Sequence, residues 1–206
     1  MNDLLQFETQ CREKGFCLIC GIDEAGRGPL AGPVCAGAVI LPEDLDIENA
    51  LPGLNDSKKL TDKKRRELFD KIKELAVAYG IGFASHEEID KINILQATYL
   101  AMHRAVANMG MEADVLLVDG NRDPGFEIPT ELIVKGDSRS ASIAAASILA
   151  KVTRDDVMME FAKEYPQYDF DVHKGYGTKK HYAALREYGK SPIHRSSFLK
   201  KFYGEK

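Results

Sequence analysis

The chain has 206 residues, of which 44% are hydrophobic and 29% charged, and its formal net charge is −4 at pH 7. This balance predicts one large globular domain, or a domain with a small appendage. No run approaches the roughly 18 consecutive apolar residues of a membrane-spanning helix, and the opening segment MNDLLQFETQ lacks the basic and then apolar layout of a secretory signal. We therefore expect a cytoplasmic protein without membrane association.

Hydrophobic periodicity divides the chain into β-type runs and helical stretches. In chain order it predicts strands at 16–23 and 34–41, a helix at 61–78, a strand at 79–85, a helix at 93–109, strands at 115–119 and 132–135, a helix at 141–164, and shorter helices at 179–187 and 197–202. Asn93 followed by Gln96 has the pattern of a capping box and marks the start of the second helix.

The order of these elements predicts the architecture. The first three strands follow one another through short or modest links, which favours antiparallel neighbours, whereas helices intervene before the fourth strand and after the fifth. We therefore predict an α/β fold with a five-stranded mixed sheet flanked by helices and a small C-terminal helical appendage. Residues 165–177, rich in Pro, Gly, Tyr and Asp, favour a boundary between a sheet domain at 1–165 and a basic helical segment at 166–206.

The net negative charge argues at first against a nucleic-acid partner, because such domains usually carry a basic footprint. The distribution is uneven, however, since residues 173–201 contain eight Lys or Arg and one acid, Glu187, a local balance of +7 that leaves −11 for the rest of the chain. Such a charge run is as often only a solvated helix face. The interleaved Tyr176, Tyr182, Tyr188 and Phe198 could stack on sugars or bases, which favours phosphate contact.

The cysteines and histidines form no recognisable metal or nucleophile motif. Cys17 and Cys20 make a C-x-x-C pair, but no second Cys/His pair stands at ligand spacing, so reduced and mostly buried thiols are expected. None of the five histidines accompanies a Cys or Ser in a triad. His173 could touch nucleic acid, and the others are interpreted as surface or packing residues.

Three carboxylate positions share one context, the C-terminal end of an apolar strand followed by Gly or small polar residues. They are Asp23 with Glu24 in GIDEAGRG, Asp119 in VLLVDGN, and Asp137 in LIVKGDS. Strand ends collect catalytic groups because the loops beyond them shape a cleft while the strands hold positions rigidly. Any one of these acids, taken alone, is more often a turn residue. Together they predict four carboxylates that converge on one place.

Four clustered carboxylates would repel one another by several kcal/mol in a partly desolvated site unless cations bind between them. Their hard oxygen atoms select Mg²⁺ or Mn²⁺ over zinc. Two such ions about 4 Å apart can activate a water on one side of a phosphodiester and stabilise the leaving oxygen on the other. The acids therefore predict a two-metal site for phosphodiester hydrolysis.

The glycine-rich loop GIDEAGRGPLAGP, residues 21–33, is the most informative segment. Gly26 and Gly28 remove side chains where the backbone could approach a substrate, and Arg27 offers a planar donor for phosphate. The spacing matches neither a Walker loop nor a G-x-G-x-x-G fingerprint, and a glycine-rich turn is often only a turn. Lys58 and Lys174 are candidate phosphate contacts, although a solvent-exposed lysine without a role explains each nearly as well.

Five blocks together resemble the bacterial ribonuclease HII family, the type 2 ribonucleases H. They are DEAGRGPLAGPV, NDSKKL, VDGN, KGDS followed by IAAASILAKVTRD, and HKGYGTKKH, and they occur in the family's order over nearly the whole chain. Type 3 ribonucleases H share the core but resemble GKG in place of GRG and carry an additional N-terminal domain, for which the leading residues leave no room. Type 2 is therefore the preferred interpretation.

The resemblance implies an RNase H-like fold whose metal site maps onto Asp23, Glu24, Asp119 and Asp137, with Mg²⁺ or Mn²⁺ as cofactor. It implies an endonuclease that cuts RNA/DNA hybrids, and duplex DNA on the 5′ side of embedded ribonucleotides, leaving 3′-hydroxyl and 5′-phosphate ends. We expect a monomer that removes misincorporated ribonucleotides. The alternatives are a type 3 ribonuclease H, another nuclease such as a resolvase on a related fold, and a non-catalytic hybrid-binding module, which would require a broken acid set.

The resemblance also implies how RNA is told from DNA. Its Gly-Arg-Gly motif, here Gly26, Arg27 and Gly28, is expected to contact the ribose 2′-hydroxyl around the cleaved bond, and its tyrosine, here Tyr176, to stack on the adjoining deoxyribose. Only the 2′-hydroxyl distinguishes the two nucleic acids at one nucleotide, and backbone donors in a glycine turn can reach it. The pair would thus sense an RNA-to-DNA junction.

Overall fold

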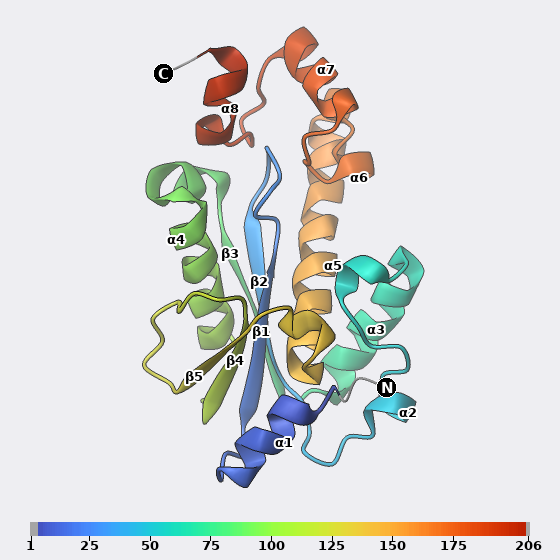
Figure 1. The fold of residues 1–206 in the computed structure, drawn as a ribbon. Coiled ribbons are helices and arrows are strands. Elements are labelled where there is room, and N and C mark those ends of the chain that lie inside the picture. Colours follow the sequence, from blue (N-terminus) through green and yellow to red (C-terminus); the bar gives the residue numbers. More distant parts are fainter. Residues whose placement is uncertain (1–3, 205–206) are drawn as a thin grey trace.

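A computed structural model of the chain describes residues 4–204 and contains a mixed five-stranded sheet (Figure 1). The strands are β1 Ile19–Ala25, β2 Val34–Ile40, β3 Ala78–Ala84, β4 Val115–Asp119 and β5 Thr130–Ile133. They lie in the order β3-β2-β1-β4-β5, with β1–β2 and β2–β3 antiparallel and β1–β4 and β4–β5 parallel. The predicted number of strands and the antiparallel pairing of the first three are confirmed.

Helices cover both faces of the sheet. They are α1 Gln6–Glu13, α2 Ile47–Ala50, α3 Asp62–Leu75, α4 His86–Ala107, α5 Ala141–Glu164, α6 Phe170–His173, α7 Lys179–Tyr188 and α8 Ser196–Tyr203, with short 3-10 turns η1 Ser57–Lys59, η2 Gly136–Ser138 and η3 Pro166–Tyr168. One hydrophobic cluster joins α4 to the sheet, and another joins α3 and α5 to the opposite face. No helix within residues 4–204 is long and apolar enough to cross a membrane.

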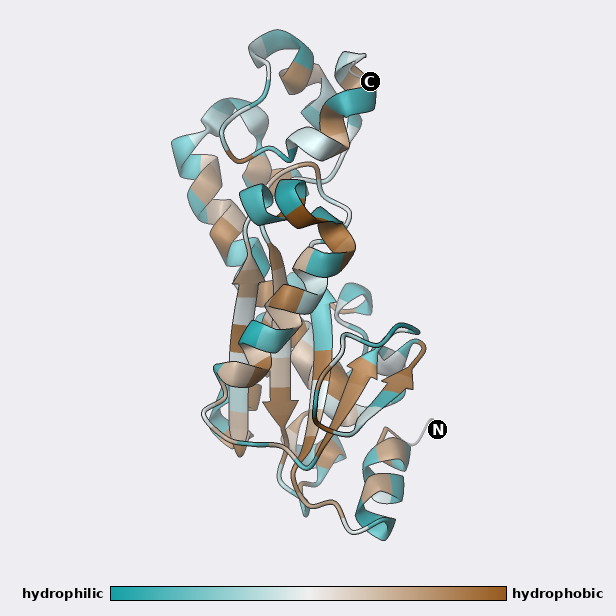
Figure 2. Cartoon of the chain, turned by 90° about the vertical axis from the view of Figure 1, so that its left-hand side faces the viewer, coloured by the Kyte–Doolittle hydropathy of each residue, from teal (hydrophilic) through white to brown (hydrophobic). Residues whose placement is uncertain are grey.

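Glycines in the strands let the helix backbones lie directly on the sheet. A Cβ atom at Gly21 of β1 would stand 2.1 Å from the carbonyl carbon of Ser142 in α5, and one at Gly37 of β2 would stand 2.5 Å from the carbonyl oxygen of Ala146. On the other face, Gly80 of β3 contacts the backbone of α4 in the same way. Figure 2 shows the strands as largely hydrophobic, as expected for a sheet covered on both sides.

The helix predicted at 93–109 begins earlier, and α4 starts at His86. A capping box at its start joins Ser85 and Glu88, and the backbone breaks at Asn93, where φ is 66°. The Asn93 side chain accepts hydrogen bonds from the amides of Leu95 and Gln96, so it caps the second part of the helix as predicted. The prediction missed the first part of α4, residues 86–92, because this helix contains two capping signals, one at Ser85 and one at Asn93, and only the second was used.

The strand predictions differ at their ends because neighbouring groups capture the backbone. The amides of Cys17 and Leu18 donate to the Asp114 carboxylate rather than to a strand, so β1 begins at Ile19. At the other edge, Lys135 adopts a left-handed conformation with φ of 58°, so β5 ends at Ile133 instead of residue 135. The helix predicted at 61–78 ends at Leu75, since β3 pairs with β2 from residue 78 onward.

The C-terminal segment, residues 166–204 of the described chain, packs on the loop that joins β1 to β2. Leu30 and Ala31 of this loop share a hydrophobic cluster with Met158 of α5 and Tyr168. Ala31 also forms an isolated antiparallel bridge with His194. Figure 1 shows α6, α7 and α8 gathered beyond the β1–β2 hairpin at the far end of α5. The division at residue 165 stays a prediction, and the two parts share this cluster.

All four cysteines are free thiols, as predicted. Cys11, Cys20 and Cys35 are buried, and burial raises the pKa of the Cys20 thiol to about 12. Cys17 is exposed instead of buried, because the strand in which we expected it begins two residues later. The buried thiols therefore act as small packing groups.

The contact between β1 and α5 gives a stability prediction. Replacing Gly21 with Ala should lower the free energy of unfolding by about 3 kcal/mol or more, since its methyl group would meet helix backbone that cannot rotate away. A Gly15→Ala control adds a methyl group where nothing lies within 4 Å, and should cost only the roughly 1 kcal/mol of its positive φ. Urea unfolding measures both, and equal losses in the two variants would contradict the prediction.

Candidate active site

The ends of β1 and β4 bring two of the predicted acids to one level. The strands are parallel with Ile22 opposite Val118, so Asp23 and Asp119 follow at the same height in the sheet. Asp137 lies beyond the end of β5, on the short turn η2. The sheet therefore gathers the four predicted positions at one edge, as the strand-end pattern indicated.

Asp119 is the common neighbour of the other acids. Its carboxylate interacts electrostatically with Asp23, Glu24 and Asp137. One of its oxygen atoms accepts a hydrogen bond of 2.6 Å from the amide of Gly136, so the turn after β5 holds it in place. We call Asp23, Glu24, Asp119 and Asp137 the acid cluster, with Asp119 at its centre.

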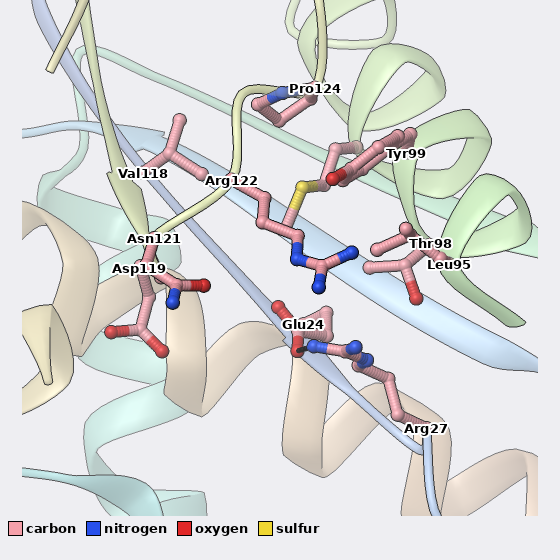
Figure 3. A pocket seen from close by; sticks show the side chains of 12 residues that line it. Glu24, Arg27, Leu95, Thr98, Tyr99, Val118, Asp119, Asn121, Arg122 and Pro124 are labelled. Carbon is pink, nitrogen blue, oxygen red and sulfur yellow. Dashed lines mark hydrogen bonds and ion pairs between the residues drawn. The ribbon is translucent and has the colours of Figure 1, made fainter. Parts of the chain in front are cut away.

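Neighbouring positions on β1 send the first two acids in different directions. Asp23 faces α5, where the Ser147 hydroxyl hydrogen-bonds to it, and only 3% of it is exposed. Glu24 points to the α4 side, where its carboxylate lies 3.3 Å from the Arg27 guanidinium. Because side chains alternate across a strand, this pair reaches the sheet edge from both faces. Figure 3 shows Glu24 and Asp119 lining one pocket.

Burial and mutual repulsion make these acids unusually basic. Burial, followed by the charges of Glu24 and Asp119, raises the pKa of Asp23 well above its ordinary value. Burial and the carboxylates of Asp56 and Asp119 raise the pKa of Asp137 to about 6. Burial also raises the pKa of Asp119 and of Glu24. The cluster therefore carries its negative charge at an energetic cost that a bound cation would offset.

The carboxylates of the site also act on Lys58. Burial alone lowers the pKa of its ammonium group, but the nearby carboxylates outweigh burial and raise it. The contributing acids are Asp23, Asp137, Asp56 and Glu24. Lys58, together with Arg27 beside Glu24, compensates only part of the negative charge of the site, so the electrostatics favour further cations between the acids.

The donor set fits a hard divalent ion. All four members of the acid cluster offer carboxylate oxygen, which Mg²⁺ and Mn²⁺ prefer. Within residues 4–204, however, no group of three or more His, Cys, Asp or Glu side chains is already arranged to hold a metal. Glu24 is turned toward Arg27, and Asp119 toward the Gly136 amide. Side-chain rotation, without movement of the sheet, would be needed to bring their oxygen atoms onto one ion.

A second pocket, of about 270 Å³, adjoins Glu24 and contains the other predicted binding residues. We call it the glycine-loop pocket, and its lining includes Gly26, Arg27, Gly28, Lys58, Lys151 and Tyr176. Tyr176 is 42% exposed, and a Cβ atom at Gly28 would stand 3.7 Å from its ring. Residues from β1, η1, α5 and the C-terminal segment thus meet around one cavity beside the acids.

Two buried arginines hold the loop of residues 26–33 in shape. The Arg195 guanidinium donates to the carbonyl oxygens of Gly26, Arg27 and Gly32 at 2.6, 2.9 and 2.9 Å. Arg154 of α5 donates to further carbonyls of the same loop and to that of Lys174. Desolvation, followed by the charge of Arg154, lowers the pKa of Arg195 to about 9.

The position of Arg154 also explains why the first residue of the Gly-Arg-Gly motif is glycine. Gly26 adopts φ of 97°, and a Cβ atom there would stand 2.0 Å from Nε of Arg154. The carbonyl oxygens of Gly26 and Arg27 accept from Arg195, whereas the backbone N–H groups of Arg27 and Gly28 form no hydrogen bond with any part of residues 4–204. Those donors are available to a ligand in the glycine-loop pocket.

Several predicted contacts lie elsewhere. Lys174 lines neither pocket, because its ammonium group binds the backbone carbonyl of Asp171 and lies 3.1 Å from the sulfur of Met159. Arg195, counted in the basic balance of the C-terminal segment, is fully buried and cannot meet phosphate. His173 is also buried, with its ring between the carbonyl of Tyr168 and an amide, so it does not present a surface to nucleic acid.

Sequence reasoning missed some residues at the site. Asp56 lies in the block NDSKKL, of which only the lysines were interpreted, yet its carboxylate hydrogen-bonds to Asp137. Two residues of α5 also belong here, since Ser147 hydrogen-bonds to Asp23 and Lys151 lines the glycine-loop pocket. Asn121 and Arg122 follow Asp119 after one glycine and line the pocket of Figure 3. The spacing of Ser147 and Lys151, one helical turn apart, was the available signal.

Three buried histidines pack together next to Tyr176, and two of them, His181 and His194, are hydrogen-bonded to each other. The ring of His181 donates from Nδ1 to the carbonyl of Tyr176 at 2.9 Å and meets Nε2 of His194 at 2.9 Å. His194 accepts at Nδ1 from the Ser191 amide, so its Nε2 carries the proton. His173 stacks on His181 with ring centroids 4.4 Å apart. Desolvation lowers the pKa of His181 and His194 to about 4, so these partners suit neutral rings.

Comparison with known proteins shows the family to which the chain belongs. The family model described as Ribonuclease HII matches residues 20–201. The chain belongs to the ribonuclease HII family. It is therefore an enzyme, a metal-dependent nuclease of the ribonuclease H class that acts on RNA in hybrids with DNA. The type 2 interpretation is confirmed in preference to type 3.

Close relatives cover most of this chain. The ribonuclease HII of Clostridioides difficile (strain 630) is 57% identical over 194 residues, which is 94% of this chain and 74% of that relative. The ribonuclease HII of Dechloromonas aromatica (strain RCB) is 59% identical over 181 residues, covering 88% of this chain and 90% of that relative. The residues 20–201 matched by the family model include every block on which the resemblance was based.

Solved structures confirm the RNase H-like fold. The ribonuclease H2 of Pyrococcus horikoshii OT3 is similar with a TM-score of 0.73 and 26% identity, covering 91% of this chain and 99% of that one. Bst-RNase HIII in complex with Mn²⁺ gives a TM-score of 0.63 at 18% identity, covering 84% of this chain and 63% of that one. The second likeness shows the shared fold alone.

The histidine group predicts a loss of stability in acid. Because the folded pKa values of His181 and His194 are about 4, below the ordinary 6.5, their contribution is complete above pH 6.5 and is lost as pH falls toward 4. The free energy of unfolding should decline by up to about 1.4 kcal/mol per pH unit for each histidine. Urea titrations across this range measure it.

The double variant His181→Asn, His194→Gln should show a shallower decline than the parent, since both titrating rings are gone while an amide donor toward Tyr176 remains. His103→Asn, outside the group, is the matched control and should keep the steeper slope. Subtracting the two curves removes the contribution of the acid cluster, whose raised pKa values act in the opposite direction. Identical slopes in all three proteins would show that the buried pair does not titrate in this range.

Proposed function

We propose that the chain cleaves the RNA strand of RNA/DNA hybrids, and duplex DNA on the 5′ side of embedded ribonucleotides. Hydrolysis would leave a 3′-hydroxyl on one product and a 5′-phosphate on the other. The observation that carries the proposal is the acid cluster around Asp119 directly beside a pocket lined by the glycine loop and Tyr176. The carboxylates that would bind the catalytic metal ions therefore lie next to the residues that would recognise the sugar.

Asp23, Glu24, Asp119 and Asp137 would hold two Mg²⁺ or Mn²⁺ ions. When bound, such ions supply an activated water and neutralise charge on the leaving oxygen. The raised pKa values in the cluster support this assignment, since close carboxylates that lack a full complement of counter-charges bind divalent ions favourably. The carboxylates act as ligands and not as covalent nucleophiles.

The glycine loop would select the ribonucleotide. The free N–H groups of Arg27 and Gly28 can donate to a 2′-hydroxyl, which DNA lacks. The ring of Tyr176, exposed above Gly28, can pack on the deoxyribose of the next nucleotide. Lys58, at the border of both regions, can bind a substrate phosphate while balancing the acids.

This specificity fits an enzyme of ribonucleotide excision repair, which removes misincorporated ribonucleotides and remnants of RNA primers. A non-catalytic hybrid-binding role would require a missing acid, and all four positions carry a carboxylate. The decisive experiment is incubation with duplex DNA holding one ribonucleotide, with and without EDTA, followed by mapping of the product ends. Cleavage that persists in EDTA, or ends other than 3′-hydroxyl and 5′-phosphate, would contradict the proposal.

Asp119→Asn should reduce metal-dependent cleavage by at least about 100-fold, because it neutralises the carboxylate that all three other acids approach. An amide oxygen still accepts the hydrogen bond from Gly136, so folding and hybrid binding should remain. The matched control is Asp114→Asn, five residues away, whose side chain likewise accepts backbone hydrogen bonds but lines neither pocket. Retained turnover in the Asp119 variant would remove Asp119 from the ligand set.

Tyr176→Ala should weaken cleavage at a single ribonucleotide about 10-fold more than cleavage of a long hybrid, since stacking by one aromatic ring is lost at the junction. Tyr176→Phe keeps the ring and should restore most of the activity. Tyr188→Ala removes another exposed tyrosine from the same segment and serves as the control. Equal losses on both substrates would exclude a junction-sensing role for Tyr176.

A further inference from the structure

A second cavity lies on the other side of Glu24 from the glycine-loop pocket. It has a volume of about 90 Å³, and Glu24 and Arg27 line both cavities. We call it the Arg122 pocket, and Figure 3 shows Arg122 extending into it toward Glu24, with Asp119 and Asn121 to one side and α4 to the other. The acid cluster thus stands between two cavities rather than at the end of one.

The guanidinium of Arg122 has no hydrogen bond or ion pair with the described residues 4–204, unlike that of Arg27, which binds Glu24. Arg122 is exposed, but Figure 3 shows its side chain extending toward Glu24, with which it could have formed an ion pair. Its planar set of N–H donors matches a phosphate group. The neighbouring side chain of Asn121 adds a further polar group to the same wall.

The loop that carries Arg122 is fixed in place. The Asp123 carboxylate accepts a hydrogen bond from the Gly125 amide at 2.8 Å, which closes the turn. Nε2 of His103, on α4, donates to the carbonyl oxygen of Pro124 at 3.1 Å, and the His103 ring lies 4.2 Å from that of Phe126, centroid to centroid. The arginine is therefore presented from a held loop, which is what a specific contact requires.

The direction of the strand follows from the proposed function, on which this step rests. If the glycine loop and Tyr176 take the ribonucleotide and the deoxynucleotide after it, the substrate runs in the 3′ direction from the acids into the glycine-loop pocket. The strand on the 5′ side of the cut must then leave across Glu24, toward the Arg122 pocket. That part of the substrate becomes the product with the 3′-hydroxyl.

We propose that Arg122 binds a phosphate of the cleaved strand on the 5′ side of the scissile bond. The contact lies outside the acid cluster and holds the upstream half of the substrate while the downstream half is held by the glycine loop. A group that binds substrate and transition state alike changes KM more than kcat. Arg122 is thus a substrate-binding residue that gives the enzyme a grip on both sides of the cut.

The test compares Arg122→Gln with Lys71→Gln on a duplex that contains one ribonucleotide. Lys71 is exposed on α3, which covers the opposite face of the sheet from α4, so the control removes the same charge far from the pocket. Arg122→Gln should lower kcat/KM about 10-fold or more, mainly through KM, as expected for a lost charge-assisted hydrogen bond. Arg122→Lys, which keeps the charge but not the planar donor set, should fall between.

Neutral methylphosphonate substitutions then locate the contact. Replacing single phosphates upstream of the cut should, at one position, slow the parent enzyme about as much as Arg122→Gln does, and should slow that variant no further. Non-additivity at a downstream phosphate, or full additivity everywhere, would overturn the inference. So would a kcat/KM for Arg122→Gln equal to that of the Lys71 control.

The proposed function and the role of Arg122 can be contradicted by different results. A parent enzyme that does not cut the single-ribonucleotide duplex contradicts the proposed function. A parent enzyme that cuts it normally, beside an Arg122 variant that is unaffected, contradicts only the role of Arg122. Circular dichroism and thermal unfolding of the variant verify that an exposed side chain was removed without loss of the fold.

Discussion

Two buried guanidinium groups determine the shape of the loop on which substrate selection would depend. Arg195, from the C-terminal segment, and Arg154, from α5, donate hydrogen bonds to carbonyl oxygens of the 26–33 loop and so hold its backbone in one conformation. Each arginine is desolvated, which would be costly without its hydrogen bonds. The loop, the long helix and residues 166–204 are therefore parts of one structure, whichever of them is called a domain.

The acid cluster illustrates the opposite strategy, in which charges are left incompletely compensated. Lys58 and Arg27 lie close to the carboxylates, yet Asp23 and Asp137 keep raised pKa values. A fully neutralised site would be more stable and would bind metal poorly. The residual repulsion is confined to one edge of the sheet, where parallel strands and helix backbones packed on glycine keep the carboxylates from moving apart.

Much of this arrangement could be predicted from the sequence, because strand-end acids follow from local patterns and chain order. The convergence of Asp23, Glu24 and Asp119 needed only the parallel pairing of two apolar runs. Burial by residues distant in sequence could not be predicted in this way. From the sequence alone Arg195 is one more surface cation, whereas in the structure it is buried against the 26–33 loop. The placement of Lys174 also depends on contacts distant from its sequence neighbours, since its ammonium group lies 3.1 Å from the sulfur of Met159 on α5.

The long helix α5 has a consequence for where the enzyme cuts. Ser147 hydrogen-bonds to Asp23, and Arg154, seven residues later, hydrogen-bonds to the glycine loop. The same helix therefore contacts both the acid cluster and the glycine loop. Two helical turns separate these contacts, a rise of about 10 Å. Under the proposed function, α5 would therefore fix the offset between the recognised sugar and the hydrolysed bond, because one rigid helix contacts both the glycine loop and Asp23.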